Sequence, residues 1–311
     1  MKAEAKKAKR SKLNRASALQ LYSMCLLPML QILIFKYLPI GGIVLAFKQF
    51  RYDKGIFGSP WVGFKNFEFF FKSDSFLVIL RNTLGLNALF IVLSLVSSIA
   101  LAIVLFRINS RKATKVYQTI LITPHFVSWV IASYVVYAFL NPQYGLVNNF
   151  LTSIGAEKID WYSTPGAWPA ILSIASVWKH VGMDSIMYYA ALMGMDSSLL
   201  EAASVDGATN WQQTRHVIIP QLMVLIVIKT ILKIGGIFHS DFGLFYQLTR
   251  DVGALYSTTD VIDTFVFRTM RVIGNMGMSS AVGLLQSIVG CLMVITTNWA
   301  SKKFDEDYGL F

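Results

Sequence analysis

Residues 201–220 read EAASVDGATNWQQTRHVIIP, a polar and regularly patterned segment between two apolar runs that are each long enough to cross a membrane. Apolar residues recur at helical spacing up to Val205, so they predict a short amphipathic helix. The pair Asp206 and Gly207 then supplies a break, and a second short helix can begin at Ala208. Gly207 tolerates a backbone conformation that a Cβ would resist, and Pro220 suits the first turn of the next long helix. The segment therefore predicts two small helices joined at an angle, a shape suited to docking.

The composition excludes a soluble domain. Of the 311 residues, 55% are hydrophobic and only 14% are charged, whereas soluble domains have about 25% charged residues. The net charge of +11 does not indicate a nucleic-acid binder, because the Lys and Arg residues surround apolar runs instead of clustering as one face would require. Cys25 and Cys291 both lie inside apolar runs, so they predict neither a disulfide framework nor a zinc site. The chain is predicted to be an integral membrane protein.

Six apolar runs of about 20 residues predict an all-α protein with six transmembrane helices. The runs cover residues 21–45, 84–106, 120–140, 168–189, 220–243 and 281–300. The first run is too long for the core of a signal peptide and is followed by no small-residue cleavage site, so it is predicted to be retained as a helix.

The positions of Lys and Arg predict the orientation of these helices. Basic residues gather in the N-terminal tail, in the loop 107–115 and at Lys302 and Lys303, and such residues favour the cytoplasmic side. With six spans both termini are cytoplasmic, and so is the segment 201–220, whereas Asn148 is expected outside. The outer segment 48–81 carries six basic residues and departs from this rule.

These predictions divide the chain into four parts. They are a basic cytoplasmic tail (1–20), the first transmembrane helix with an aromatic outer segment (21–76), a core of five transmembrane helices (77–300, with the docking loop at about 196–220), and a cytoplasmic C-terminal tail (301–311).

The docking segment resembles a known loop. The order EAA (201–203), two residues, DGA (206–208), and a hydrophobic-x-hydrophobic-Pro ending at 217–220 resembles the EAA loop of permease subunits in ATP-binding-cassette (ABC) importers. The resemblance implies a type I importer fold, and a loop that inserts into a cleft of the ATPase subunit and couples nucleotide-driven closure to the membrane helices. Thr214 and Val224 depart from the pattern, where an aromatic residue and a second proline are expected. The residues that the resemblance assigns to ATPase coupling are Glu201, Ala202, Ala203, Asp206, Gly207, Ala208 and Pro220.

Two further stretches resemble the carbohydrate-uptake branch of these permeases, in particular the polysaccharide-permease subfamily of Gram-positive bacteria. They are FKQFRYDKGIFGSPWVGFKNFEFFF (47–71) and FVFRTMRVIGNMGMSSAVGLLQ (265–286). The resemblance implies import of an oligosaccharide or complex glycan across the bacterial cell membrane. It also implies four kinds of partner: a second, non-identical permease, two cytoplasmic ATPases that hold ATP and Mg, an extracellular lipid-anchored binding protein, and membrane lipid. The aromatic outer segment is then either a membrane anchor or a contact surface for the binding protein.

No catalytic or metal-binding chemistry is predicted. The chain has no G-x-x-x-x-G-K-[ST] loop, so ATP is expected to be hydrolysed by another subunit and no cofactor is expected here. The four histidines lack metal-ligand spacing. Two rivals, an ion-coupled secondary transporter and a membrane-embedded enzyme, would need intramembrane carboxylates with an internal repeat, or a catalytic set, and neither is evident.

Charged residues inside the predicted helices are the candidates for a substrate pathway, because each costs several kcal/mol unless it faces a partner or a hydrated cavity. Two interpretations stay open: Lys229 and Lys233 pair with Asp184 or with a neighbouring subunit, or they line a hydrated sugar pathway. If Lys179, Lys229 and Lys233 lack counterions, the glycan itself could be acidic. The candidate pathway residues are Trp178, Lys179, Asp184, Tyr188, Lys229 and Lys233.

Overall fold

The computed structural model describes residues 15–304 and 309, and side chains for residues 20–303 and 309. Within this part of the chain all named elements are helices, and the one β-type pairing is an isolated bridge between Lys48 and Trp61. The all-α prediction is confirmed for these residues. Most of the predicted basic tail 1–20, and residues 305–308, 310 and 311 of the predicted C-terminal tail, lie outside them.

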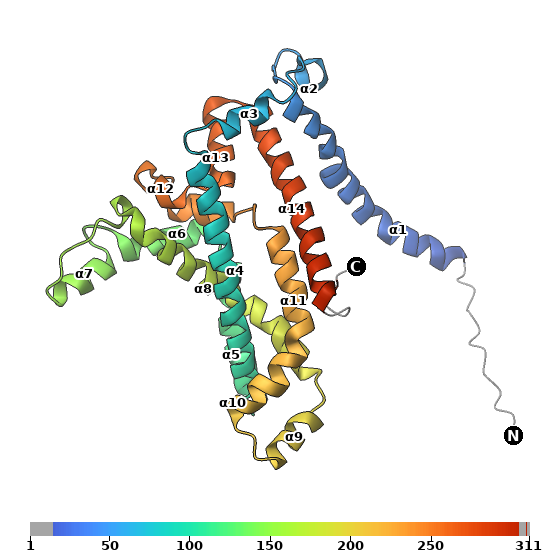
Figure 1. Ribbon diagram of the computed structural model, residues 1–311, viewed down its shortest axis with the longest axis vertical. Coiled ribbons are helices and arrows are strands. Elements are labelled where there is room, and N and C mark those ends of the chain that lie inside the picture. Colours follow the sequence, from blue (N-terminus) through green and yellow to red (C-terminus); the bar gives the residue numbers. More distant parts are fainter. Residues whose placement is uncertain (1–14, 305–308, 310–311) are drawn as a thin grey trace.

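The long helices form the body of the molecule, and short helices connect them (Figure 1). The long ones are α1 (Arg15–Ile32), α4 (Phe76–Phe106), α5 (Arg111–Phe126), α6 (Trp129–Leu140), α8 (Trp168–Met193), α11 (Ile219–Gly235) and α14 (Met276–Phe304). The short ones are η1 (Leu33–Tyr37), η2 (Leu38–Phe47), α2 (Gly55–Gly58), α3 (Lys65–Phe71), α7 (Leu146–Ser153), η3 (Trp161–Ser163), η4 (Pro165–Ala167), α9 (Ser198–Val205), α10 (Asn210–Gln213), η5 (Thr214–Ile218), η6 (Leu244–Leu248), η7 (Gly253–Leu255), α12 (Tyr256–Thr259), α13 (Ile262–Arg268) and η8 (Thr269–Ile273).

Four helical stretches of the described chain are long and apolar enough to cross a membrane, and a bent helix pair could make a fifth span. The four are Gln20–Phe47, Phe76–Phe106, Asn210–Gly235 and Met276–Lys303. The fourth predicted run does form a helix, α8, but this helix carries Lys179, His180 and Asp184 and is not among the four. The count of six spans therefore stays a prediction.

The prediction of one continuous helix over residues 120–140 is wrong. The chain breaks after Phe126, and α5 and α6 meet at a bend of 96°. Pro124 removes a backbone donor near the end of α5, and the Ser128 side chain accepts a hydrogen bond from the backbone N–H of Ile131, which starts α6 as a separate helix.

The fifth predicted run ends earlier than expected, because α11 stops at Gly235 and not at residue 243. The backbone beyond it is satisfied by side chains from other helices, as non-helical backbone inside a membrane protein requires. The amide of Asn87 donates to the carbonyl of Ile237 (2.7 Å), and the amide of Gln286 donates to the carbonyl of Phe238 (2.6 Å).

Helix α4 runs through most of the length of the molecule and packs along α8 (Figure 1). At the lower end of this pair, Ala102 of α4 is buried with Tyr188 and Leu192 of α8 and with Leu222 of α11. Helix α8 also lies close to α5, where a Cβ on Gly182 would come 1.8 Å from the carbonyl oxygen of Leu121. Only glycine permits this approach.

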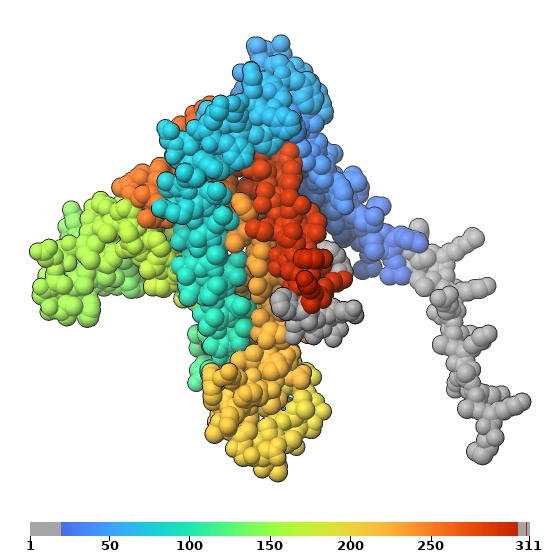
Figure 2. All heavy atoms as spheres, viewed as in Figure 1, coloured from blue at the N-terminus to red at the C-terminus, as the bar shows by residue number. Residues whose placement is uncertain are grey.

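The first helix stands apart from the rest. Helix α1 extends away from the body in Figures 1 and 2, and the chain joins the body through η2, which packs on α14. Most of the apolar side chains of Gln20–Phe47 are exposed, as expected for a surface that faces lipid or another membrane subunit.

The outer segment and the predicted docking loop lie at opposite ends of the molecule. Helices α2 and α3 are at the top of Figure 1, and α9 and α10 are at the bottom. This arrangement is the one that the predicted orientation requires, because the two regions must face opposite sides of the membrane.

Candidate functional site

The docking loop forms the two predicted short helices, α9 and α10. Helix α9 contains residues 201–203, and its end has the hydrogen bonds of a Schellman motif: the N–H of Ala208 donates to the carbonyl of Ala203 (2.9 Å) and that of Gly207 to the carbonyl of Ser204 (3.1 Å). This motif needs a left-handed residue, and Gly207 has φ of 77°. The second helix begins slightly later than predicted, at Asn210, after Thr209 caps it.

Helix α10 continues into the membrane without interruption. The helical stretch Asn210–Gly235 joins α10, η5 and α11, and Pro220 lies in the first turn of α11. The amide of Gln213 donates to the Ser204 hydroxyl (3.0 Å) and fastens α9 to α10. The docking loop and α11 are therefore joined by one continuous helical stretch.

One arginine outside the loop holds it in place. Arg107, at the end of α4, donates to the side chain (2.5 Å) and backbone carbonyl (2.7 Å) of Asn210, and to the hydroxyl of Thr214 (2.8 Å). Thr214 departs from the family pattern, but its hydroxyl accepts one of these hydrogen bonds from Arg107. The sequence analysis used Arg107 only as a marker of orientation and missed this role, since a contact between residues so far apart in the chain leaves no local pattern.

The exposed face of the loop is apolar in part. Glu201, Asp206 and Gly207 are exposed, but so are Val205 (87%) and Trp211 (67%). A cavity of ≈ 330 Å³ lies beside them, with Ala203, Asp206, Gly207, Ala208, Gln212, Gln213, His216 and Val217 in its wall. Exposed large apolar residues around a hollow at one end of a protein indicate a binding surface, and Trp211 within a polar segment could have signalled it.

At the start of the loop, the carboxylate of Asp196 accepts a hydrogen bond from the backbone N–H of Ser198 (3.0 Å). This bond, together with the Ser198 hydroxyl, lowers the pKa of Asp196 below its usual value. The first turn of α9 therefore begins with a fixed negative charge, which favours the helix.

Four of the six candidate pathway residues come together in a cluster on α8 and α11. One carboxylate oxygen of Asp184 pairs with Lys229 and the other with Lys233, both at 2.8 Å. Lys229 also lies over the ring of Tyr188, 5.0 Å from its centroid. The Ser94 hydroxyl of α4 donates to Asp184 (2.9 Å) and accepts from Lys233 (2.7 Å). The cluster joins three helices and satisfies both lysines within this chain.

Lys179 lies elsewhere and has another partner. Its ammonium donates to the carbonyls of His125 (3.2 Å) and Val127, at the break between α5 and α6, and lies 5.0 Å from the ring centroid of Trp129. It thus satisfies the carbonyls that end α5. Together with the two paired lysines, this contact removes the observation on which the hypothesis of an acidic glycan rested, namely three lysines without counterions.

A cavity of ≈ 290 Å³ adjoins the cluster. Asp184, Lys233 and Ser94 line it together with polar residues from α4, α8 and the chain after α11, namely Asn87, Ser176, His180 and His239. Of the remaining candidates, Tyr188 is buried and Trp178 is exposed, and neither lines this cavity. Phe90, Ile91 and Ile237 also line the cavity, so its wall combines these polar groups with apolar surface.

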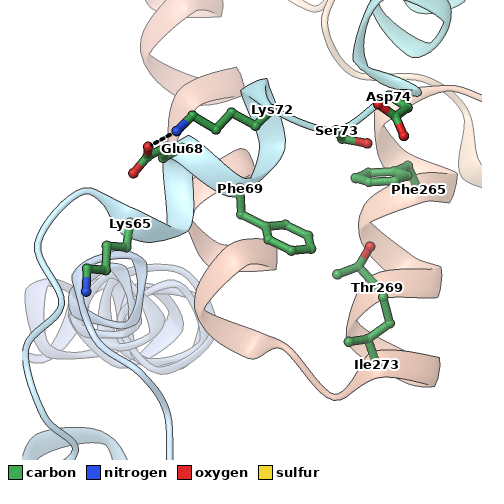
Figure 3. Close-up of a pocket in the computed structure, with 9 residues that line it drawn as sticks. All are labelled: Lys65, Glu68, Phe69, Lys72, Ser73, Asp74, Phe265, Thr269 and Ile273. Carbon is green, nitrogen blue, oxygen red and sulfur yellow. Dashed lines mark hydrogen bonds and ion pairs between the residues drawn. The ribbon is translucent and has the colours of Figure 1, made fainter.

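The outer segment forms an open groove of ≈ 680 Å³ against the last third of the chain (Figure 3). Phe69 of α3 points into the groove, opposite Phe265 and Thr269 of α13 and η8. Lys72 pairs with Glu68 at the rim, and this contact lowers the pKa of Glu68. The groove brings together the two stretches 47–71 and 265–286 that the sequence analysis singled out separately.

Comparison with known proteins decides the family. Residues 95–306 match the family model described as "Binding-protein-dependent transport system inner membrane component". This range contains the docking loop and Asp184, Lys229 and Lys233 of the charge cluster. The chain belongs to this family. As a member it is a membrane-embedded permease of an ABC importer that works with a solute-binding protein, and ATP is hydrolysed in a separate subunit.

Relatives in this permease family match nearly the whole chain. Protein LplB of Bacillus subtilis is 33% identical over 94% of this chain and 91% of its own length. The polygalacturonan/rhamnogalacturonan transport system permease protein YteP of the same organism is 34% identical over 92% and 89%.

Solved structures of the family share the fold. A chain in the crystal structure of a bacterial ABC transporter involved in the import of the acidic polysaccharide alginate superposes with a TM-score of 0.83, at 32% identity over 92% of this chain and 96% of that one. The same transporter type in complex with an alginate pentasaccharide-bound periplasmic protein gives a TM-score of 0.82. The predicted importer fold is confirmed, and the number of spans is not tested by this likeness.

Proposed function

We propose that the chain is one permease subunit of an ABC importer for oligosaccharides or complex glycans. The observation that carries this proposal is its likeness, over nearly its full length, to the permease of an alginate importer. The relative YteP, whose name refers to polygalacturonan and rhamnogalacturonan, supports a glycan as the class of substrate. A second, non-identical permease would complete the pathway, two ATPases would hold ATP and Mg, and a lipid-anchored binding protein would deliver the glycan from outside.

The docking loop would transmit the movement of the ATPase. The exposed face around Glu201, Ala202, Asp206 and Gly207, with the half-buried Ala203 and Ala208 beside it, would enter the ATPase cleft. The unbroken helix from Asn210 would carry the motion past Pro220 into α11. This helix holds Lys229 and Lys233, so movement of the loop would reach the charge cluster and the cavity beside it.

The outer groove would contribute to the docking of the binding protein. It is open, it lies at the end of the molecule opposite the loop, and it combines Phe69 and Phe265 with a charged rim. Aromatic residues surrounded by polar groups are typical of protein contact surfaces.

The test is uptake of a labelled oligosaccharide into proteoliposomes that contain this permease with its partner permease, ATPases and binding protein. Uptake should require enclosed ATP on the ATPase side and persist when ionophores dissipate ion gradients. Uptake that needs an ion gradient and no ATP would instead support a secondary transporter.

A matched pair of glycine variants tests the coupling role of the loop. Gly207→Ala places a Cβ at φ of 77°, which costs about 1–2 kcal/mol, so transport per ATP hydrolysed should fall several-fold. Gly194→Ala, at a helix end with φ of −89°, should leave that ratio unchanged. Equal ratios in both variants would remove Gly207 from the coupling path.

A further inference from the structure

Two consecutive residues, Arg250 and Asp251, have a strained backbone. Their φ values are 55° and 51°, and they are the non-glycine residues with positive φ in the described chain. Such a conformation is unfavourable for a residue with a Cβ and persists where the surroundings enforce it, often at ligand-binding sites. The strain lies in the turn between η6 and η7, directly after the segment that packs against α6.

The two side chains of this turn have different surroundings. The carboxylate of Asp251 is held by Arg268 (2.9 Å) and by the hydroxyl of Tyr256 (3.0 Å). The guanidinium of Arg250 lies over the ring of Tyr137 in α6, 4.3 Å from the centroid, and forms no ion pair with any described residue. Arg250 is thus an exposed guanidinium that stacks on a ring and has no ion pair among the described residues.

That charge borders a polar cavity of ≈ 240 Å³. Val130, Ser133 and Tyr134 of α6, Tyr246 and Gln247 at the η6 end, and Asp251 line it with Arg250. The carboxylate of Asp251 is the one held by Arg268 and Tyr256. Helix α6 belongs to the bent pair that is apolar enough to be a membrane span. A cation within the membrane is costly unless it faces a counterion or a hydrated cavity, and the cavity beside Arg250 would meet that need if this end of α6 lies at membrane depth.

We propose that this Arg250 cavity is a subsite for a carboxylate-bearing sugar residue, such as a uronic acid unit of the glycan. Arginine presents paired N–H donors that match a carboxylate in two parallel hydrogen bonds. The rings of Tyr134 and Tyr246 offer apolar surface with a polar edge, and the hydroxyl of Ser133 and the amide of Gln247 can bond the sugar hydroxyls.

This inference rests on the proposed function, and it assigns the selectivity for acidic glycans to Arg250. The lysines of the charge cluster are unsuited to this task, because Asp184 and Ser94 already satisfy Lys229 and Lys233. Within the described chain, Arg250 therefore offers a guanidinium that is available to an incoming carboxylate, whereas the lysines of the charge cluster are already paired.

The experiment compares transport of a galacturonate trimer and a glucose trimer by the complete importer. Binding protein, partner permease and ATPases stay unchanged, so any change in selectivity arises in this chain. The variants are Arg250→Gln, Arg250→Lys and, as a matched control, Arg271→Gln. Arg271 is also an exposed arginine that lies over a ring, that of Phe267 (5.8 Å), but it is not in the wall of the cavity.

Arg250→Gln should lower transport of the acidic trimer about tenfold, which is the effect of losing one charged hydrogen-bonding partner of about 1.4 kcal/mol. Assembly, basal ATP hydrolysis and any transport of the neutral trimer should be unchanged. Arg250→Lys should restore part of the acidic transport, and Arg271→Gln should leave it intact.

The subsite is overturned if Arg250→Gln matches Arg271→Gln, or if it slows both sugars in equal proportion. An unmodified importer that carries only the neutral trimer would also overturn it and leave the proposed function standing. Failure to carry any oligosaccharide would instead count against the proposed function itself.

Discussion

At the scale of single residues, Asp184 holds the charge cluster together. Its two carboxylate oxygens hold two lysines of another helix, and its side chain is 19% exposed. Charges removed from water in this way are stable only as a complete set, because the loss of one partner leaves the others desolvated and unpaired.

Asp184→Asn is therefore expected to destabilise the protein by about 3 kcal/mol, seen as a lower temperature of aggregation in detergent. The matched control is Asp53→Asn, which removes the carboxylate of an ion pair with Arg51 whose side chains are both more than half exposed; its effect should stay below about 1 kcal/mol. A combined variant, Asp184→Asn with Lys229→Met and Lys233→Met, should recover most of the loss. No recovery would show that the cluster acts through more than its charges.

Gly182 is the residue that sets the distance between α5 and α8. Gly182→Ala should force these helices apart, since its Cβ would meet the carbonyl oxygen of Leu121 at 1.8 Å, and overpacking of this kind costs about 1–3 kcal/mol or more. Gly85→Ala in α4, where nothing lies within 4 Å of the added atom, is the control and should be neutral or slightly stabilising. Thermal aggregation of the two purified variants provides the comparison.

At the scale of elements, the predictions succeeded where one local pattern decides the structure. The polar segment 196–220 contains its own helix stop, Gly207, and the two short helices follow. The break between α5 and α6 was not predicted, although Pro124 and Ser128 lie in the run, because residues 120–140 are mostly apolar on both sides of it. Lys179 of another helix also satisfies carbonyls at the break, and no local pattern shows that contact. The sequence could not decide the partners of Lys229 and Lys233 either. The packing of α8 against α11, and not the order of residues in the chain, brings Asp184 to them.

Arg107 connects two elements, the end of α4 and the start of α10, so its removal should loosen the docking loop. Arg107→Gln cannot reach both Asn210 and Thr214, and transport per ATP hydrolysed is expected to fall several-fold while the assembled complex persists. Arg111→Gln, which removes an exposed arginine at the start of α5, is the control. If both variants keep the normal ratio of transport to ATP hydrolysis, Arg107 serves stability only.

At the scale of the whole molecule, the structure separates the docking loop, the charge cluster and the outer groove along the long axis. The docking loop is at one end, the outer groove is at the other, and the charge cluster lies between them on the helices α8 and α11 (Figure 1). A long helix that begins in the loop and contains two members of the cluster gives a physical route between the ATPase side and the interior. This route exists only if the loop faces the cytoplasm.

The orientation can be tested by labelling single cysteines with a membrane-impermeant thiol reagent in cells, after Cys25→Ser and Cys291→Ser remove the exposed native thiols. Asn148, expected outside from the sequence, is unsuitable because it is fully buried and its amide group bonds the carbonyl of Ile159 (2.8 Å) and the indole N–H of Trp161 (3.1 Å). Tyr144→Cys is the better position, since that side chain is 80% exposed.

Tyr144→Cys should react in intact cells, and Val205→Cys in the docking loop, where the native side chain is 87% exposed, should react only after the membrane is opened. Asn148→Cys serves as the control for burial and should react slowly in both cases. The basic residues around 107–115 and at Lys302 and Lys303 favour this result, and those of the outer segment 48–81 oppose it. Reaction of Val205→Cys in intact cells would reverse the orientation, and the loop could then no longer meet a cytoplasmic ATPase.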